Sequence, residues 1–295
     1  MASTDVSVSV TLGSLVDDVL GMFNFNPGPM CWLSSGIDDS TLSVPLAGGV
    51  ALAPGATIEV DHELMLVSAF DSNSGVMTLA PRGRGWRGSP ASAHESGAVV
   101  SVAPPVSRWS TIRAINAEVS ALFPALMAVR PLETSVSGGT IPLDVETDCV
   151  LDVRVLDSDG VTWSRVRWWE TESSLPSGVA ASGRGVSVPS VKDGDVVQVV
   201  VGGRPSLLTS TDDDFTETGL PESAAALVSL GAAIRLLPSL DSYRLTFPTV
   251  GNQEQAQLGS ASLLVREWTR TYTSRLDAES REFRRRFPAR AHYTR

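Results

Sequence analysis

The chain has 295 residues and a mass of 31.2 kDa, with 42% hydrophobic and 19% charged residues, a composition that excludes a disordered or fibrous protein. Its net charge is −10, but residues 261–295 carry nine arginines against four acidic residues, which leaves 14 basic and 29 acidic groups in residues 1–260. An acidic body of this kind disfavours non-specific binding to DNA or to a membrane surface, because both need positive potential.

The first half of the chain alternates between helical and strand-like patterns. Residues 11–23 have apolar side chains at helical spacing and predict a short amphipathic helix. From residue 40 the pattern changes to short apolar runs separated by Gly and Pro, which predicts a small barrel or curled sheet. Residues 107–130 return to helical spacing, and Pro124 is expected to kink or end that helix.

Residues 130–203 are again rich in strand-like segments. The run around Asp157–Gly160 predicts a hairpin, because Asp, Ser and Gly favour a tight turn between two apolar segments. Residues 195–203 predict a further strand after a Lys-Asp-Gly turn. A compact β-sandwich is therefore expected here.

Helices are expected from the acidic link at 209–218 to the end of the chain. Pro221 and Glu222 suit the first turn of a helix that runs to about residue 237. A long helix is predicted over residues 253–287, because its apolar positions follow steps of three and four, with Glu279 as the one break. These positions are Leu258, Ala261, Val265, Trp268, Tyr272, Leu276, Phe283 and Phe287.

These elements together predict an α+β fold. Neither outer helical segment can bury a core alone, so we expect the N-terminal, central and two C-terminal helices to form one helical core. Two all-β modules, a small barrel and then a sandwich, would be inserted into it. The expected divisions are an N-terminal helix in 1–40, a barrel module in 41–104, a central helix in 105–130, a second β module in 131–212, and C-terminal helices with a basic tail in 213–295.

The sequence offers no credible catalytic centre, and no enzyme activity, cofactor or metal is predicted. Residues Gly83–Gly88 match the GxGxxG spacing. A dinucleotide site needs a helix directly after this motif, whereas here a strand-like run follows. We therefore expect a glycine-rich loop between two strands. Alternation places His62 on one strand face and Glu59, Asp61 and Glu63 on the other, which disfavours a metal cluster. His94 and His292 are isolated in the sequence.

Two further kinds of residue group favour structural roles. The acidic clusters at 157–159, 193–195 and 212–214 lie in turns or links, where solvated Asp is the ordinary interpretation and calcium binding stays open. Trp163, Arg165, Arg167 and Trp169 are expected on one strand face, as an ordinary sheet surface or a subunit contact rather than a nucleic-acid site.

The cysteines and the apolar runs bear on the compartment. Cys31 and Cys149 are 118 positions apart, so they form neither a metal-ligand spacing nor a disulfide framework. No secretory signal or membrane-spanning run is recognised either. We therefore expect a soluble protein that folds in a reducing compartment.

The stretch from Glu59 to Pro104 resembles a small β-module that is common in virion proteins of tailed phages. In that module a strand of the form E-hydrophobic-x-V leads to an arginine–glycine turn, small residues, a histidine and GAxV. The matching positions are Glu63–Val67, Arg82–Gly83, Arg87–Gly88, Ala93–His94 and Gly97–Val100. Helical segments of phage head-to-tail connector proteins are similar to TLGSLVDDVL at 11–20, to residues 107–126, to GAAIRLL at 231–237 and to RFPARAH at 286–292.

This resemblance implies a structural protein of the virion neck, assembled in the host cytoplasm. It would form an adaptor ring of about twelve copies that joins the portal to the tail and lines the DNA channel. Its partners would be the portal ring, other copies of itself, and a stopper or tail-terminator protein, with DNA only passing through and no membrane contact. Residues 131–212 depart from the minimal adaptor, so another virion part (a stopper, tail terminator, or minor tail or receptor-binding protein) is the alternative.

The basic end of the chain supplies the residues expected to dock on the portal. Arginines would provide charge, and aromatic side chains would provide apolar anchors. The alternative is a solvated helix end that is favoured by the helix dipole. The docking candidates are Arg281, Phe283, Arg284, Arg285, Arg286, Phe287, Arg290, Tyr293 and Arg295.

Overall fold

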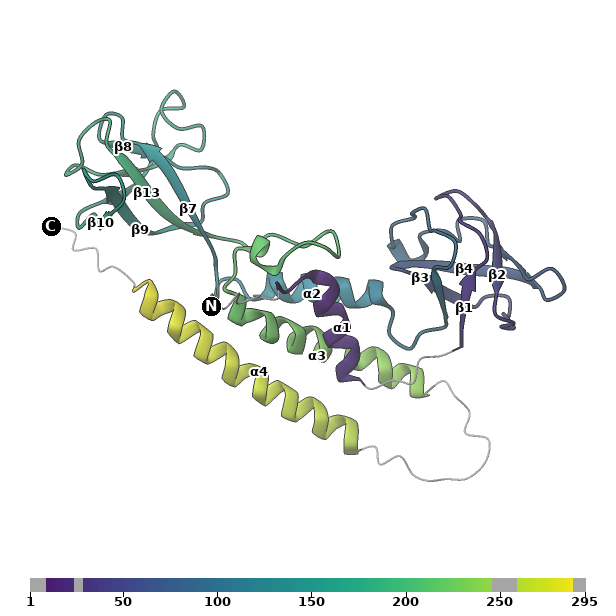
Figure 1. Ribbon diagram of the computed structural model, residues 1–295. Coiled ribbons are helices and arrows are strands. Elements are labelled where there is room, and N and C mark those ends of the chain that lie inside the picture. The colour runs from purple at the N-terminus through teal and green to yellow at the C-terminus, as the bar shows by residue number, and fades with distance from the viewer. Residues whose placement is uncertain (1–8, 24–28, 246–258, 289–295) are drawn as a thin grey trace, which may run out of the picture. The chain divides into compact units, whose positions relative to one another are not determined.

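The computed structural model of the protein describes residues 9–23, 29–245 and 259–288 (Figure 1). These residues form four α-helices and 13 β-strands. Strands therefore outnumber helices in the described part of the chain.

Internal contacts divide the chain into two compact units. The barrel unit comprises Leu12–Ala117 and Val228–Arg270, and the sandwich unit comprises Met1–Thr11, Glu118–Leu227 and Thr271–Arg295. Each unit is described by itself below. The helices that contribute residues to both units are α2 (Arg108–Ala121), α3 (Ala225–Leu245) and α4 (Gly259–Arg286).

The predicted helical core with two inserted β modules is wrong. The described chain has 13 strands and four α-helices, and the helices are divided between two units that each contain a β structure, so no separate helical body is present among the described residues. The physical reason is that alternating strand residues close an apolar cluster inside each β structure, around Val44 and Ile58 in one and around Val153 and Val197 in the other. Mixed α and β content is all that remains of the prediction.

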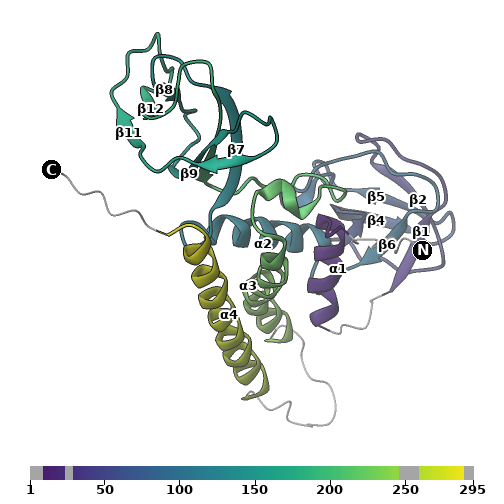
Figure 2. The same ribbon diagram turned by 60° about the vertical axis from the view of Figure 1, so that its left-hand side comes forward.

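The barrel unit contains a closed six-stranded barrel in the order β1-β2-β5-β4-β3-β6, in which all neighbours are antiparallel (Figure 2). Closure leaves no unpaired sheet edge. Cys31, Met65 and Met77 are fully buried inside it. The strands are β1 (Met30–Leu33), β2 (Ser43–Ala47), β3 (Thr57–Val60), β4 (Glu63–Asp71), β5 (Val76–Leu79) and β6 (Val99–Val102).

Two helix predictions in the first half of the chain can be compared directly. The predicted N-terminal helix is confirmed as α1 (Leu12–Met22), which buries Leu12, Leu15, Val16 and Val19. The central helix α2 begins after Ser107, whose hydroxyl accepts the Ser110 N–H at 3.0 Å as an N-cap.

The central helix ends earlier than the pattern suggested. Helix α2 stops at Ala121, before Pro124, because proline lacks the N–H that a helix interior needs. The expectation of helix up to residue 130 is wrong, since residues 128–135 form strand β7 and pair with β13. Pairing with β13 therefore makes residues 128–135 a strand, although the apolar spacing predicted a helix up to residue 130.

The sandwich unit has two antiparallel sheets, ordered β10-β9-β13-β7 and β11-β12-β8. Side chains from both sheets, including Ile141, Val186 and Val199, form one apolar cluster. The predicted hairpin is confirmed: β9 and β10 pair, and the Gly160 N–H donates to the Asp157 carbonyl at 2.9 Å. The strands are β7 (Ala128–Ser135), β8 (Thr140–Pro142), β9 (Cys149–Leu156), β10 (Trp163–Arg165), β11 (Glu170–Ser173), β12 (Arg184–Ser187) and β13 (Val196–Gly203).

The link before α3 is tied down by a short 3₁₀-helix, Phe215–Thr218. Asp214 and Glu217 form a capping box at its start. Helix α3 then continues through Pro238 and is longer than predicted. The stretch Glu222–Leu240 is long and apolar enough to cross a membrane, but 67% of it is buried within the protein, as in the core helix of a globular protein.

The apolar stripe predicted for the last helix is confirmed along the described part of α4. Side chains at these positions are half-buried or buried from Val265 to Phe287, and the Glu279 carboxylate accepts a hydrogen bond from the Ser223 hydroxyl at 2.9 Å. In the barrel unit, the rings of Trp268 and Phe23 are 5.9 Å apart. Leu258 and the side chain of Ala261 lie outside the described residues.

Burial of Phe215 predicts a large effect on stability. Its side chain is fully buried, and its N–H donates to the Val10 carbonyl at 2.7 Å. Phe215→Ala is expected to lower the free energy of unfolding by about 3–5 kcal/mol, measured by urea denaturation. The matched control is Trp168→Ala, because Trp168 is 76% exposed in the same unit and should change the free energy little. Equal effects of the two substitutions would contradict this packing.

Candidate functional site

The docking candidates fall into three groups in the structure. Arg281, Arg284, Arg285 and Arg286 are exposed at the C-terminal end of α4, where positive charge opposes the negative end of the helix dipole. Phe283 is half-buried. Phe287 is 9% exposed. Arg290, Tyr293 and Arg295 lie outside the described residues.

Phe283 and Phe287 pack against each other at the end of α4. Their ring centroids are 5.3 Å apart and the rings are tilted by 52°. The Arg286 guanidinium lies 5.4 Å from the centre of the Phe287 ring. Because Phe287 is buried within its own unit, the exposed arginines are the members of the group that a partner can reach.

Few contacts occupy these arginines. Arg285 pairs with Glu282 at 2.8 Å on the surface, an arrangement that contributes little to stability. The Arg281 Nε donates to the Asp277 carbonyl at 3.1 Å. Arg284 makes no hydrogen bond or ion pair with a described residue. We call these four residues, Arg281 and Arg284–Arg286, the α4 arginine cluster.

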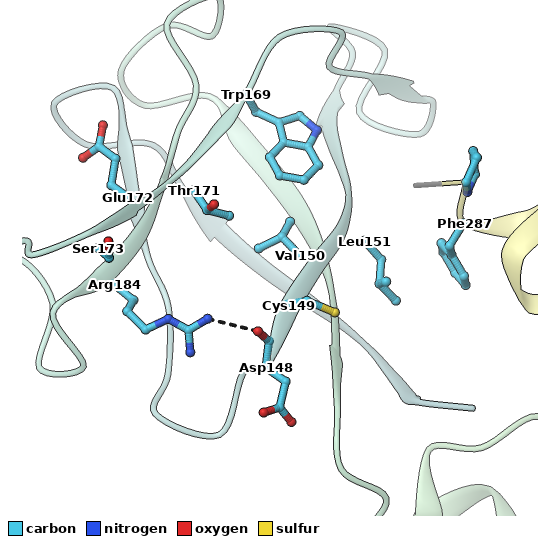
Figure 3. Close-up of a pocket in the computed structure, with 11 residues that line it drawn as sticks. Asp148, Cys149, Val150, Leu151, Trp169, Thr171, Glu172, Ser173, Arg184 and Phe287 are labelled. Atoms are coloured by element: carbon cyan, nitrogen blue, oxygen red, sulfur yellow. Dashed lines mark hydrogen bonds between the residues drawn. The ribbon is translucent and has the colours of Figure 1, made fainter. Parts of the chain in front are cut away.

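A cavity of about 370 Å³ lies beside the end of α4, between β9, β11 and β12 (Figure 3). Phe287 and Leu151 form one wall, and Trp169 and Val150 lie deeper among the strands. The Arg184 guanidinium donates to the Asp148 carbonyl at 3.1 Å and to the Thr147 carbonyl, so it fastens a loop.

The acidic groups around this cavity do not form a pair. Figure 3 shows the carboxylates of Asp148 and Glu172 on opposite sides of the residues that line the cavity, pointing away from each other. Most glycoside hydrolases use two carboxyl groups that flank the scissile bond. The cavity therefore does not present that arrangement.

The second candidate site is an ion network inside the barrel unit, centred on Glu63. The Glu63 side chain is fully buried, and its carboxylate accepts hydrogen bonds from Arg84 Nε (2.7 Å) and Nη2 (2.9 Å). It also accepts the backbone N–H groups of Gly85 (2.9 Å) and Ser92 (3.1 Å). Such charge-assisted bonds compensate the cost of burying a carboxylate.

His94 joins this network to the solvent. Its Nε2 lies 2.9 Å from the Glu63 carboxylate and its Nδ1 lies 2.7 Å from that of Asp61, which is half-exposed. The Ser92 hydroxyl lies 3.5 Å from Nε2. Both ring nitrogens face carboxylates, so the imidazolium form donates to both.

The pKa values follow from these contacts. Burial alone raises the pKa of Glu63, but hydrogen bonds from Arg84, His94, Gly85 and Ser92 outweigh it and hold the pKa at about 2. Burial lowers the pKa of His94, but its hydrogen bonds to Glu63 and Asp61 outweigh that and raise it above the ordinary value.

The predicted alternation around His62 is wrong, and this is why the network was missed. Strands β3 and β4 pair Val60 with Glu63, so Asp61 and His62 form a two-residue turn, and Asp61 has a φ of 52°. The turn brings Asp61 and Glu63 to His94, more than 30 positions away in the sequence. Glu59, expected to face outward, is 5% exposed and accepts the Trp109 N–H at 3.1 Å.

The glycine-rich loop at 83–88 joins two strand regions, as predicted. A Cβ at Gly83 would lie 2.7 Å from the Leu66 carbonyl oxygen, and one at Gly85 would lie 2.8 Å from that of Ser89. Glycine is required here for close packing and for positive φ, and only a three-residue 3₁₀ turn follows instead of an α-helix.

The expected common face of Trp163, Arg165, Arg167 and Trp169 is wrong. Strand β10 ends at Arg165, and beyond it Trp168 is 76% exposed whereas Trp169 is 7% exposed and belongs to the core. Arg165 instead pairs at 3.0 Å with the buried carboxylate of Asp152.

The acidic turns have the ordinary interpretation in the structure. Asp159 accepts the backbone N–H of Thr162 at 2.9 Å, and Asp214 caps the 3₁₀-helix. In the described ranges, no three His, Cys, Asp or Glu side chains gather where they could hold a metal ion.

Comparison with known proteins assigns no family. No protein-family model matches the chain, and no curated protein matches it either.

The ion network predicts a pH dependence of stability. A histidine whose pKa is raised on folding stabilises the protein fully below its unfolded pKa of about 6.5, and this contribution is lost as the pH rises through the higher folded value. His94→Gln should lower the free energy of unfolding by about 1–3 kcal/mol at pH 6 and flatten its fall above about pH 6.5. Urea denaturation across a pH series measures both, with His62→Gln as control. An unchanged pH profile would contradict the network.

Burial of Glu59 predicts a second pH dependence of stability, in a lower pH range than that of His94. Burial raises the pKa of Glu59 from 4.5 to about 7, against the effect of its hydrogen bonds at the start of α2. The folded protein therefore loses stability as the pH rises from about 4.5 through 7. Glu59→Gln keeps an acceptor for the Trp109 N–H and should raise the free energy of unfolding at pH 8 by about 1–3 kcal/mol, measured by urea denaturation. A loss of stability at pH 8 would overturn this assignment.

Proposed function

We propose that this chain is a structural protein of a tailed-phage neck, an adaptor that docks on the portal ring and joins it to the tail around the DNA channel. The observation that carries the proposal is the α4 arginine cluster, exposed at the end of a chain that is otherwise acidic. The order of the phage-like segments along the sequence is the reason for choosing a neck adaptor rather than another assembly protein. Its location would be the virion neck, after assembly in the host cytoplasm.

Charge is the first support. Residues 1–260 hold 29 acidic against 14 basic groups, while four exposed arginines gather within the last two turns of α4. A cluster of this sign fits an acidic docking face on another protein. Arginine suits such contacts because its planar guanidinium binds carboxylates in a bidentate manner.

Position is the second support. Phe287 is buried and lines the cavity together with Leu151 of β9, so the end of α4 has a fixed position within the sandwich unit. Arginines on a fixed helix lose little conformational entropy when they bind. A ring subunit needs preformed faces of this kind, since each copy contacts its neighbours in the same way.

Another virion part, such as a stopper, tail terminator or receptor-binding tail protein, is the second candidate. It is favoured by the exposed apolar side chains of the sandwich unit, where Trp168 is 76% and Val161 is 78% exposed. Exposed aromatic residues are frequent in recognition surfaces. Under this alternative the sandwich unit would carry the binding function.

Measuring the mass of the purified chain, alone and mixed with the portal protein of the same virus, distinguishes a neck adaptor from another virion part. For an adaptor we expect a complex with about twelve copies on each portal ring. No binding to the portal, together with trimers or hexamers of the chain alone, would contradict the proposal and favour the alternative.

The α4 arginine cluster can be tested with Phe283 and Phe287 in place. Changing all four arginines to Gln should weaken portal binding at least tenfold and lower the melting temperature only slightly, because the Arg285–Glu282 pair and the Arg286–Phe287 contact lie at the surface. The matched control changes Arg266, Arg270 and Arg275 to Gln, since these arginines are exposed on the same helix. Binding is measured by sedimentation. Equal binding by both variants would contradict the docking assignment.

A further inference from the structure

The first 107 residues contain three lysine or arginine residues in all, and these are the arginines at positions 82, 84 and 87, within one glycine-rich loop. The structure gives them two different environments. The Arg84 side chain is 7% exposed and neutralised by Glu63. Arg82 and Arg87 are exposed and make no hydrogen bond or ion pair with a described residue.

Both exposed arginines have an unfavourable backbone conformation. The φ angle is 63° at Arg82 and 56° at Arg87, in the left-handed region where Gly and Asn are preferred. The ion network around Glu63 imposes this backbone path, and neither side chain gains a hydrogen bond or ion pair with a described residue that would offset its cost.

The loop that carries them is rigidly held. The Gly83 carbonyl accepts the Leu66 N–H at 2.8 Å, and the Gly85 N–H donates to Glu63 at 2.9 Å. Arg84 also donates to the Thr41 carbonyl (3.1 Å) and to the carbonyls of Asp38 and Ser92. The buried arginine therefore fixes the backbone from which Arg82 and Arg87 project.

We propose that Arg82 and Arg87 form a contact surface for the acidic face of a second copy of this chain. Two guanidinium groups on a fixed loop suit carboxylates, and most of this chain's own charge is acidic. Duplex DNA is a poorer fit, because the first 107 residues hold ten acidic residues against these three arginines. A contact between unlike faces is the kind that closes a ring.

The inference rests on the proposed function in one respect, that a ring needs a contact between its copies. Its surface is nevertheless distinct from the α4 arginine cluster, so the two proposals can fail separately. Portal binding by a chain that never self-associates would overturn this inference alone. Self-association through the loop without portal binding would overturn the proposed function alone.

The test uses the full chain with Arg82→Asn and Arg87→Asn together. Asn adopts the left-handed region more readily than Arg, so the double variant should melt at the same temperature or higher. The matched control is Arg113→Gln, because Arg113 is exposed on α2 in the same unit and has no described partner. Sedimentation velocity is measured over a range of protein concentrations, at low and at high salt.

We expect the unmodified chain and the Arg113 variant to self-associate at low salt and to dissociate at high salt. The double variant should associate at least tenfold more weakly. A monomeric unmodified chain at every concentration, or unchanged association of the double variant, overturns the proposal. Loss of binding to a labelled DNA duplex with unchanged self-association also overturns it and reassigns the loop to phosphate contacts.

Discussion

The barrel unit depends on the buried carboxylate of Glu63. A fully buried charge is tolerated only when hydrogen bonds and opposite charges replace its hydration, and here Arg84, His94 and two backbone N–H groups do so. These donors come from the loop at 82–94, so a single anion fixes the path of the chain between β5 and β6. Removing any one partner would leave the carboxylate partly uncompensated.

This constraint gives the sequence pattern of residues 59–104 a structural explanation. The glutamate at the start of β4, the arginine–glycine loop and the histidine belong to one structural network, in which each polar group is occupied by another. Residues that hold each other in this way are not available to a substrate. The pattern therefore describes how a small barrel is closed.

Both surfaces that we propose for binding share a physical arrangement. In each, a buried group anchors the backbone and exposed arginines project from it: Arg84 anchors Arg82 and Arg87, and Phe287 anchors the α4 arginine cluster. An anchored charge loses little freedom on binding. Such surfaces suit assembly between proteins better than chemistry on a small molecule, which needs a concave and enclosed site.

The sequence by itself determined the features that depend on near neighbours: the helix α1, a kink or end of the central helix at Pro124, the turn at Asp157–Gly160 and the apolar stripe of α4. Only the tertiary structure decided the rest. It placed Asp61 and Glu63 against His94, buried Phe287, gave residues 128–135 to a β ladder and divided the helices between two units. Helical and strand periods report which side of one element is apolar, whereas these contacts join segments far apart in the chain. Their partners are fixed by packing and by the need to neutralise buried charge, which no local pattern records.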